Sequence, residues 1–349
     1  MKVLRFRHHF CERTLSFPRY FPRPLLLHHC TFWQSRSMAT VKDSIPHIIR
    51  TADDPRQNGI WSSRLSRIEQ INSRIRLLRL SLPKEGPSLR HLPGQYIDLY
   101  IPNIDVVGGF TITSAPQDSN QSQEDPHIEL AIQSSPDNPP AAYLWRPISQ
   151  ILGSTVSFKV GGTFVYPPLT LSRQKCEKID RVVFIAGGVG INPIMSMISA
   201  IDEVGVRQAV GSMPKRMRVL YSARRDLTPQ GEKEDILFEH RLEEMARKWN
   251  KHPQVDYQYR LFQTGLSGGP TTSSKRSASP FDNSNPDNMT THNRRITHDD
   301  LFDAIGPEGS RRNTVVYVCG LPTMTDEFVY LFEGCPGLDE KRVLCEKWW

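Results

Sequence analysis

The sequence predicts an antiparallel β-barrel domain followed by an α/β domain whose parallel sheet binds a nucleotide. Two patterns carry this prediction. Before residue 181, short segments of alternating apolar and polar residues are separated by turn-forming residues, which is typical of antiparallel strands with one face in water. After that residue, continuous apolar segments alternate with helical patterns, as a parallel sheet covered on both faces requires. At 349 residues the chain can form two such cores.

The predicted barrel covers about residues 63–170. One or two strands are expected between Ile68 and Pro83, and Pro139 and Pro140 are expected to open a short helix. The other strands are expected at 93–102, 110–114, 127–133 and 156–160. Several short strands with a single short helix are typical of a small antiparallel barrel. Residues 43–62 are interpreted as a polar lead-in to this domain.

The predicted α/β domain covers residues 178–349. Strands are expected at 182–186, 218–221, 254–262, 314–319 and 342–345, and helices at 191–204, 236–249, 297–305 and 322–332. Within this domain, residues 264–295 are dense in Ser, Thr, Gly, Pro and Asn. Such a segment cannot bury enough apolar surface to offset its ordering entropy, so it is predicted to be a disordered insertion.

The first strand of the α/β domain ends in a glycine-rich turn that leads into a helix. Gly187, Gly188 and Gly190 follow the apolar strand, and Pro193 suits the first turn of the helix. Glycine lets the backbone approach a bulky anion, and amides at a helix N-terminus favour negative charge. The turn is therefore interpreted as a pyrophosphate cradle, with a purely structural turn as the alternative. It does not follow the Gly-x-Gly-x-x-Gly fingerprint.

The positive charge of the chain is concentrated in residues 1–42. This segment holds eight Lys and Arg residues and one acid, Glu12, a surplus equal to the whole net charge of +7. The rest of the chain is near neutral, which argues against nucleic-acid binding. A leader rich in Arg, Phe and Ser and poor in acids is typical of a mitochondrial transit peptide, so we expect a mitochondrial location. The alternative is a basic tail without a targeting role.

Two further patterns exclude classes of protein. Residues 182–201 carry no charge, but their glycines, Asn192 and Pro193 divide them into a strand and a helix, so no membrane span is expected. The six cysteines form no Cys-x-x-Cys pair, and their spacing matches neither a zinc site nor an iron–sulfur cluster. No metal is expected, and any electron transfer would depend on an organic cofactor.

Four stretches in this order resemble the ferredoxin–NADP reductase superfamily. Phe110-Thr111 stands at the aromatic–Ser/Thr of its Arg-x-Tyr-Ser/Thr flavin motif. The run from Gly187 to Pro193 is similar to its Gly-Gly-x-Gly-x-x-Pro turn, and Cys319-Gly320-Leu321-Pro322-Thr323-Met324 is similar to its Cys-Gly-Pro-Pro-x-Met. Glu346-Lys347-Trp348-Trp349 resembles its acidic–x–aromatic ending. Each motif is weak alone, but four in register are specific.

The resemblance implies an enzyme that passes a hydride from NAD(P)H to FAD, and electrons from there to an acceptor that the sequence does not identify. It implies catalytic roles for Cys319 beside the nicotinamide, for Glu346 as a proton relay or a polar neighbour of that centre, and for Thr111 near the flavin. Phe110 would cover one flavin face, and Trp348 or Trp349 the other. The residues expected to contact a cofactor are Phe110, Thr111, Ile112, Thr113, Gly187, Gly188, Val189, Gly190, Ile191, Asn192, Pro193, Arg224, Gly320, Trp348 and Trp349.

Two departures bear on the flavin. Gly108 replaces the arginine that binds the flavin phosphate in the superfamily, and Ala141-Ala142 stands where a phosphate-binding serine is common. Flavin could be held by other residues, such as Arg146, or be absent. The rival hypothesis is therefore a nucleotide-binding module of the same fold without flavin or catalysis.

The choice between NAD and NADP depends on the residues after the second strand of the parallel sheet. Arg224 and Arg225 could pair with a 2′-phosphate, whereas Asp226 could bind the free ribose hydroxyls of NAD. The Gly-Gly-Phe-Thr variant and the Trp-Trp ending resemble a mitochondrial group within the superfamily that is associated with NAD. NAD is therefore preferred, without excluding NADP.

Overall fold

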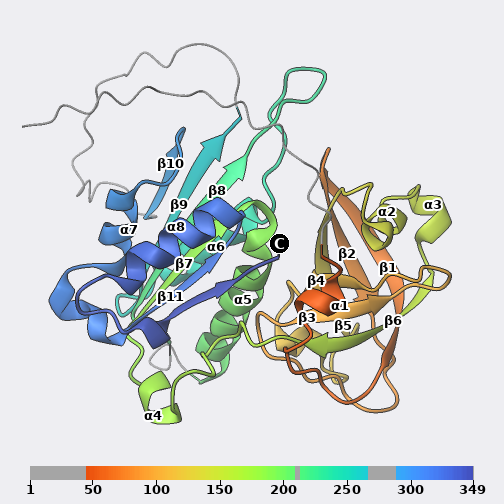
Figure 1. Ribbon diagram of the computed structural model, residues 1–349, viewed down its shortest axis with the longest axis horizontal. Coiled ribbons are helices and arrows are strands. Elements are labelled where there is room, and N and C mark those ends of the chain that lie inside the picture. Colours follow the sequence, from red (N-terminus) through yellow and green to blue (C-terminus); the bar gives the residue numbers. More distant parts are fainter. Residues whose placement is uncertain (1–44, 209–212, 266–287, 349) are drawn as a thin grey trace, which may run out of the picture. The chain divides into compact units, whose positions relative to one another are not determined.

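A computed structural model describes residues 45–208, 213–265 and 288–348. The predicted leader at 1–42, most of the predicted insertion and Trp349 lie outside these ranges. The two halves of the described chain are an antiparallel sheet and a parallel sheet with helices, as the sequence predicts (Figure 1).

The first half is a six-stranded antiparallel barrel with strand order β4-β3-β6-β1-β2-β5. Its strands are β1 Trp61–Asn72, β2 Ile75–Ser81, β3 Tyr96–Tyr100, β4 Gly108–Thr111, β5 His127–Gln133 and β6 Thr155–Gly161. The edge strands β4 and β5 meet through a bridge between Ile112 and Leu130, which closes the sheet. Leu65, Leu78, Ile97 and Phe158, which point inward, form the centre of its core. The short helices α2 Pro139–Leu144 and α3 Ile148–Ile151 lie between β5 and β6.

The predicted polar lead-in at 43–62 is wrong in its described part. Residues 47–50 form the short helix α1 His47–Arg50, and β1 begins within the predicted lead-in at Trp61. Arg56 pairs with Gly161 in an isolated antiparallel bridge, and Gln57 N–H donates to the Val160 carbonyl at 2.8 Å. A four-residue helix is too short to show a periodic pattern, and its contacts are made with distant strands.

The second half is a six-stranded sheet with strand order β10-β9-β8-β7-β11-β12, in which every pair is parallel. Its strands are β7 Arg181–Gly187, β8 Arg216–Arg224, β9 Asp256–Thr264, β10 Met289–His292, β11 Thr314–Cys319 and β12 Val343–Glu346. The central strand β7 is buried on both faces, which explains its continuous apolar sequence.

Helices cover both faces of this sheet (Figure 1). α5 Ile191–Gln208 and α6 Glu239–Trp249 pack on the face that contains Val182 and Phe184. α7 His298–Ile305 and α8 Pro322–Glu333 pack on the face that contains Val183 and Ile185. Among the described residues, no helix combines the length and the apolar character that crossing a bilayer requires.

The predicted insertion at 264–295 is too wide at both ends. β9 extends through Thr264, and residues 289–292 form β10, which pairs in parallel with β9 from Tyr259 to Phe262. β10 is a short edge strand of mostly polar residues. Its sequence Met-Thr-Thr-His carries no apolar signal of its own, so the open edge of β9 rather than local pattern determines it.

The barrel and the parallel sheet share polar contacts on helix α5. The Asn192 amide donates to the Ala131 carbonyl on β5 at 2.9 Å, and the Ser196 hydroxyl donates to the Ser114 carbonyl at 2.8 Å. These two side chains are four residues apart and so lie on one face of the helix. α5 therefore supports the glycine turn at its start and binds the barrel along its length.

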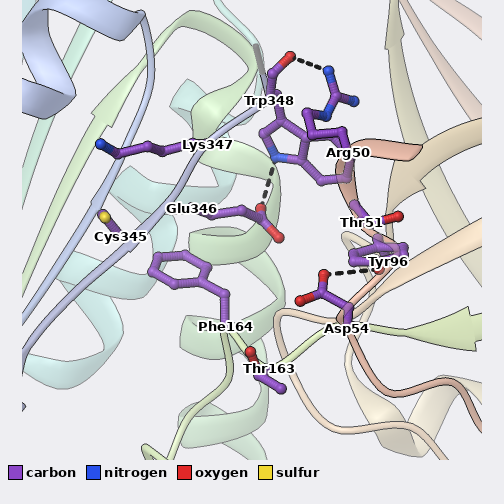
Figure 2. A pocket seen from close by; sticks show the side chains of 10 residues that line it. All are labelled: Arg50, Thr51, Asp54, Tyr96, Thr163, Phe164, Cys345, Glu346, Lys347 and Trp348. Atoms are coloured by element: carbon purple, nitrogen blue, oxygen red, sulfur yellow. Dashed lines mark hydrogen bonds between the residues drawn. The ribbon is translucent and has the colours of Figure 1, made fainter. Parts of the chain in front are cut away.

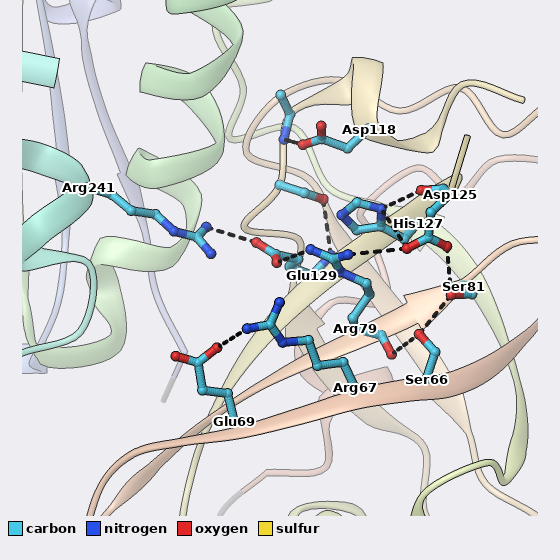
Figure 3. Close-up of polar contacts among 12 residues, drawn as sticks. Ser66, Arg67, Glu69, Arg79, Ser81, Asp118, Asp125, His127, Glu129 and Arg241 are labelled. Atoms are coloured by element: carbon cyan, nitrogen blue, oxygen red, sulfur yellow. Dashed lines mark hydrogen bonds and ion pairs between the residues drawn. The ribbon is translucent and has the colours of Figure 1, made fainter. Parts of the chain in front are cut away.

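A second contact is an ion-pair cluster around Glu129 of β5 (Figure 3). Its carboxylate forms ion pairs with the guanidinium groups of Arg79 from β2, at 3.3 Å, and of Arg241 from α6, at 2.8 Å. Burial alone raises the pKa of Glu129, but the hydrogen bonds and charges of the two guanidinium groups outweigh it and hold the pKa below its usual value. The carboxylate therefore stays ionised and joins the two domains through charge-assisted hydrogen bonds.

Candidate functional site

Two loops meet at the carboxyl edge of the parallel sheet, and glycines allow the close approach. A Cβ on Gly190 would lie 2.3 Å from the Cys319 carbonyl oxygen, and a Cβ on Gly320 would lie 2.9 Å from the Gly187 backbone nitrogen. A Cβ on Gly187 would lie 3.0 Å from the Met324 methyl group. Gly190 and Gly320 are therefore required by the packing of the loop after β7 on the loop after β11, whereas a Cβ on Gly187 would meet only the flexible end of Met324.

Gly188 differs from these three glycines. It has φ +56°, is exposed, and a Cβ placed on it would meet no atom within 4 Å. Its Cα therefore faces open space at the start of α5. This is the part of the turn at which a pyrophosphate could lie against bare backbone, with the amino end of α5 below it.

Cys319 and Glu346 lie side by side where β11 and β12 end. They are register partners in the parallel pair, and Cys319 is 1% exposed. Burial, with a smaller contribution from the Glu346 charge, raises the pKa of the Cys319 thiol well above its usual value. Cys319 is therefore a neutral thiol, which suits packing against a neutral ring better than nucleophilic attack. Burial also raises the pKa of the Glu346 carboxyl to about 8.

Glu346 lines a pocket of about 180 Å³ that also contains Trp348, Phe164, Tyr96 and Arg50 (Figure 2). Trp348 Nε1–H donates to the Glu346 carboxyl at 2.8 Å, and the Arg50 guanidinium donates to the Trp348 carbonyl at 2.6 Å. Thr51 and Asp54 line the pocket from the segment before β1, and Thr163 lines it from the segment after β6. The predicted cluster of Cys319, Glu346 and Trp348 thus comes together beside the glycine turn.

Trp348 stacks on a histidine. The rings of Trp348 and His47 lie 5.7 Å apart with an interplanar angle of 16°, and Tyr96 meets both rings edge-on. His47 Nε2 hydrogen-bonds the Asp98 carboxylate at 2.7 Å. His47, Arg50, Tyr96 and Asp98 were not predicted as site residues. The one available signal was the acidic Asp98 within the otherwise apolar strand β3.

Phe110 and Thr111 lie on opposite faces of β4. Thr111 is paired with Tyr96, which lines the pocket, whereas the Phe110 ring packs against the barrel core. Phe110 is half-buried, and its predicted role in covering a cofactor ring stays a prediction. Thr111 is buried on the same face as Tyr96 and Asp98.

Several other predicted contact residues are buried inside the protein. Ile112 and Thr113 are fully buried, Ile112 in the barrel core, and Ile191 belongs to the core under α5. Pro193 is buried, and Asn192 uses its amide on the barrel. These residues shape the turn and the domain interface. Within the turn, the less buried positions that a nucleotide could contact are Gly187, Gly188 and Val189, and of these only Val189 has a side chain.

The two arginines after β8, Arg224 and Arg225, form ion pairs with acidic side chains. Arg225 is buried and makes two 2.6 Å bonds to the Glu239 carboxylate. Arg224 is exposed and donates to Asp226 at 2.7 Å, and Arg74 from the barrel reaches the same carboxylate at 3.2 Å. The predicted cofactor contact of Arg224 therefore competes with an ion pair, and Asp226 is shared between two guanidinium groups.

The described residues do not fit the flavin phosphates that the fold family implies. A Cβ on Gly108 would lie 2.5 Å from the Phe110 ring and 2.8 Å from Pro140, so the space of the missing arginine is filled. The first two residues of α2 are prolines without an N–H, and the Ala141 and Ala142 amides donate to the side chain and the carbonyl of Asn138. The start of α2 therefore offers no free donor to a phosphate.

Comparison with known proteins agrees with this architecture. Residues 184–329 match the family described as the oxidoreductase NAD-binding domain. "Oxidoreductase NAD-binding domain-containing protein 1" of Bos taurus is 29% identical over 306 residues, which cover 87% of this chain and 85% of the bovine protein. The protein of that name from Danio rerio is also 29% identical, over 87% of this chain and 97% of its own length.

A solved structure shows the same arrangement of a barrel and a parallel sheet. The CS-b5R domains of human Ncb5or, in an NAD+ form, superpose with a TM-score of 0.55 at 16% identity, covering 84% of this chain and 70% of that chain. The chain has the ferredoxin–NADP reductase fold. The pocket of Glu346 and Trp348 in this chain is lined from both halves.

Proposed function

We propose that this protein is a nicotinamide-dinucleotide-dependent oxidoreductase. One observation carries the proposal: the open Gly188 turn and the Cys319–Glu346 pair lie at the same edge of the sheet, next to a pocket. A dinucleotide whose pyrophosphate rests on Gly188 would extend its nicotinamide toward Cys319. The match of residues 184–329 to an oxidoreductase NAD-binding domain supports the choice of a nicotinamide dinucleotide as the ligand.

In the proposed reaction, the dihydronicotinamide C4 gives a hydride, with two electrons, to an acceptor that reaches the pocket. Loss of the hydride leaves the nicotinamide ring positively charged, and the acceptor takes one proton to complete its reduction. Glu346 is the proposed source of this proton, because a carboxyl with a pKa of about 8 is mostly protonated near neutral pH. Cys319 supplies a neutral, buried surface against which the ring is held.

We prefer NAD(H) to NADP(H) for this site. A 2′-phosphate requires an available cation, and Arg224 and Arg225 both pair with acids, Asp226 and Glu239. We expect purified protein to bind NADH more tightly than NADPH. Calorimetric titrations with both nucleotides test this preference, and tighter binding of NADPH would contradict it.

We do not assign FAD as the hydride acceptor. The sequence resemblance implies FAD, but Gly108, α2 and β4 do not provide the contacts that its phosphates and ring would need. The rival function, a nucleotide-binding module without catalysis, is favoured by the same observation. Oxidation of NADH at 340 nm with a panel of quinones, ferricyanide and free flavins separates the two functions. NADH binding with no turnover in every assay would favour the module.

We also propose a mitochondrial location from the composition of residues 1–42. A fusion of this segment to a fluorescent protein should accumulate in mitochondria. A diffuse signal would contradict the proposal.

A further inference from the structure

A segment of the chain covers the face of β4 that carries Gly109 and Thr111, and the resemblance places Thr111 near a flavin. We call residues 46–56 the strap. It includes α1 and continues to Arg56, which joins the end of β6. A Cβ on Gly109 of β4 would lie 2.1 Å from His47 Nδ1, so the imidazole is in direct contact with this strand. The other side of the imidazole stacks on Trp348. His47 thus lies between β4 and the aromatic residue near the end of the chain.

The strap also satisfies the polar groups on this face of the barrel. Asp98, which pairs with Gly109 across β3 and β4, is 2% exposed and is bonded by His47 at 2.7 Å and by Arg56 at 3.0 Å. Burial alone raises the pKa of Asp98, but these hydrogen bonds outweigh it and hold the pKa below its usual value. Removal of the strap would leave a buried carboxylate without these partners, which is costly.

The strap is bound at both ends of this surface. Asp54 accepts a hydrogen bond from the Tyr96 hydroxyl at 2.9 Å, and Arg50 donates to the Trp348 carbonyl at 2.6 Å. The pocket left beside it measures about 180 Å³, below the roughly 300–1,000 Å³ of typical cofactor sites. The strap therefore fills this surface with specific contacts instead of lying loosely across it.

We infer that the strap, with His47 stacked beneath Trp348, takes the place of a flavin, so that this chain binds NAD(H) without FAD. The inference rests on the proposed function only for the retained nucleotide site. It explains why the arginine position, Gly108, is closed by Phe110 and Pro140, and why the α2 amides are capped within the chain. Among the described residues, protein atoms thus occupy the Gly109 face of β4, the space beside Gly108 and the first amides of α2.

The first test uses the full chain expressed in cells supplied with riboflavin. We expect no stoichiometric flavin in the extracted protein, and we expect added NADH to slow hydrogen exchange in the peptide that contains Gly187 to Asn192. Stoichiometric FAD together with NADH binding would overturn this inference alone. Flavin-free protein that shows no NADH binding would overturn the proposed function, so the two failures are distinguishable.

The second test disturbs the strap and measures hydrogen exchange of its amides. Gly109→Ala places a methyl group within the His47 ring, so strap amides should exchange about tenfold faster. Gly309→Ala is the matched control, because a Cβ on Gly309 meets no atom within 4 Å. Should Gly109→Ala not fold, His47→Ala removes the ring without adding atoms, and the same acceleration is expected. Unchanged exchange in a folded variant would overturn the contact, as would added FAD that displaces the strap.

Discussion

The two halves of this molecule differ in the space that they leave for their expected ligands. At the edge of the parallel sheet, Gly188 leaves open space where a pyrophosphate could bind, and the neighbouring Gly190 and Gly320 only serve loop packing. On the barrel, Gly108 and Gly109 leave no space, because Phe110, Pro140 and His47 lie where a side chain or ligand would be. A glycine therefore marks an open position in one half and a position closed by protein atoms in the other. Only the atoms around each glycine distinguish the two cases.

Gly188→Val changes the half that leaves space for a ligand, and it should have the largest effect of all the variants on NADH affinity. The branched side chain would project into the space assigned to the pyrophosphate, so NADH affinity should fall about a hundredfold or more, equivalent to roughly 2.7 kcal/mol. Titration calorimetry measures this change.

Gly231→Val is the matched control for backbone strain. Gly231 also has a positive φ, +84°, and a Cβ on it meets no atom within 4 Å. Both variants should lose about 1–2 kcal/mol of stability through the left-handed conformation, but only Gly188→Val should lose nucleotide binding. Equal NADH affinity in the two variants would refute the cradle.

Cys319→Ala should affect hydride transfer more than binding. Its proposed contact is with the reacting ring, so the rate of NADH oxidation should fall about tenfold while the NADH dissociation constant changes little. Cys335→Ala is the control, because Cys335 is also buried but lies in the core beneath α7 and α8. A parallel loss of rate and affinity in Cys319→Ala would place the nicotinamide elsewhere.

Glu346→Gln should change how the stability of the protein depends on pH. Burial raises the pKa of Glu346 from 4.5 to about 8, so the folded protein binds this proton more tightly than the unfolded chain. The stability of the wild type should therefore decrease as pH rises through about 8, whereas the variant lacks this contribution.

Relative to the wild type, Glu346→Gln should gain at most about 3–4 kcal/mol as pH rises from about 5 to about 8, and the difference should stay constant above about pH 9. Urea denaturation at several pH values measures the difference. A difference that does not change with pH would show that the carboxyl is ionised throughout the range.

Asn192→Ala should have the smallest effect and should spare the nucleotide site. It removes the bond to the Ala131 carbonyl between α5 and β5, which contributes about 1 kcal/mol to stability. NADH affinity should remain unchanged, because the side chain points to the barrel. A large loss of affinity would restore the role in cofactor contact that the sequence motif implies.

The sequence motif for the flavin site did not predict the side chains that lie around it. Phe110-Thr111 is in register with the superfamily motif, yet Phe110 packs on the barrel core and the opposite face of β4 is covered by His47. The strap could not be predicted because its contacts join residues 51 positions apart, as in His47 and Asp98, or 298 apart, as in Arg50 and Trp348. Neither contact leaves a local pattern.

The resemblance to known reductases, and no local pattern, implied that Cys319 and Glu346 share one site. The sequence by itself determined the two domains and most of their strands and helices. These follow from hydrophobic periodicity and from the rule that parallel strands end at one edge of a sheet, both of which are local or topological. Only the tertiary structure decided which glycines border open space and which contact protein atoms, and that His47 stacks on Trp348. Those answers depend on side chains brought together from opposite ends of the chain, whose packing no single segment encodes.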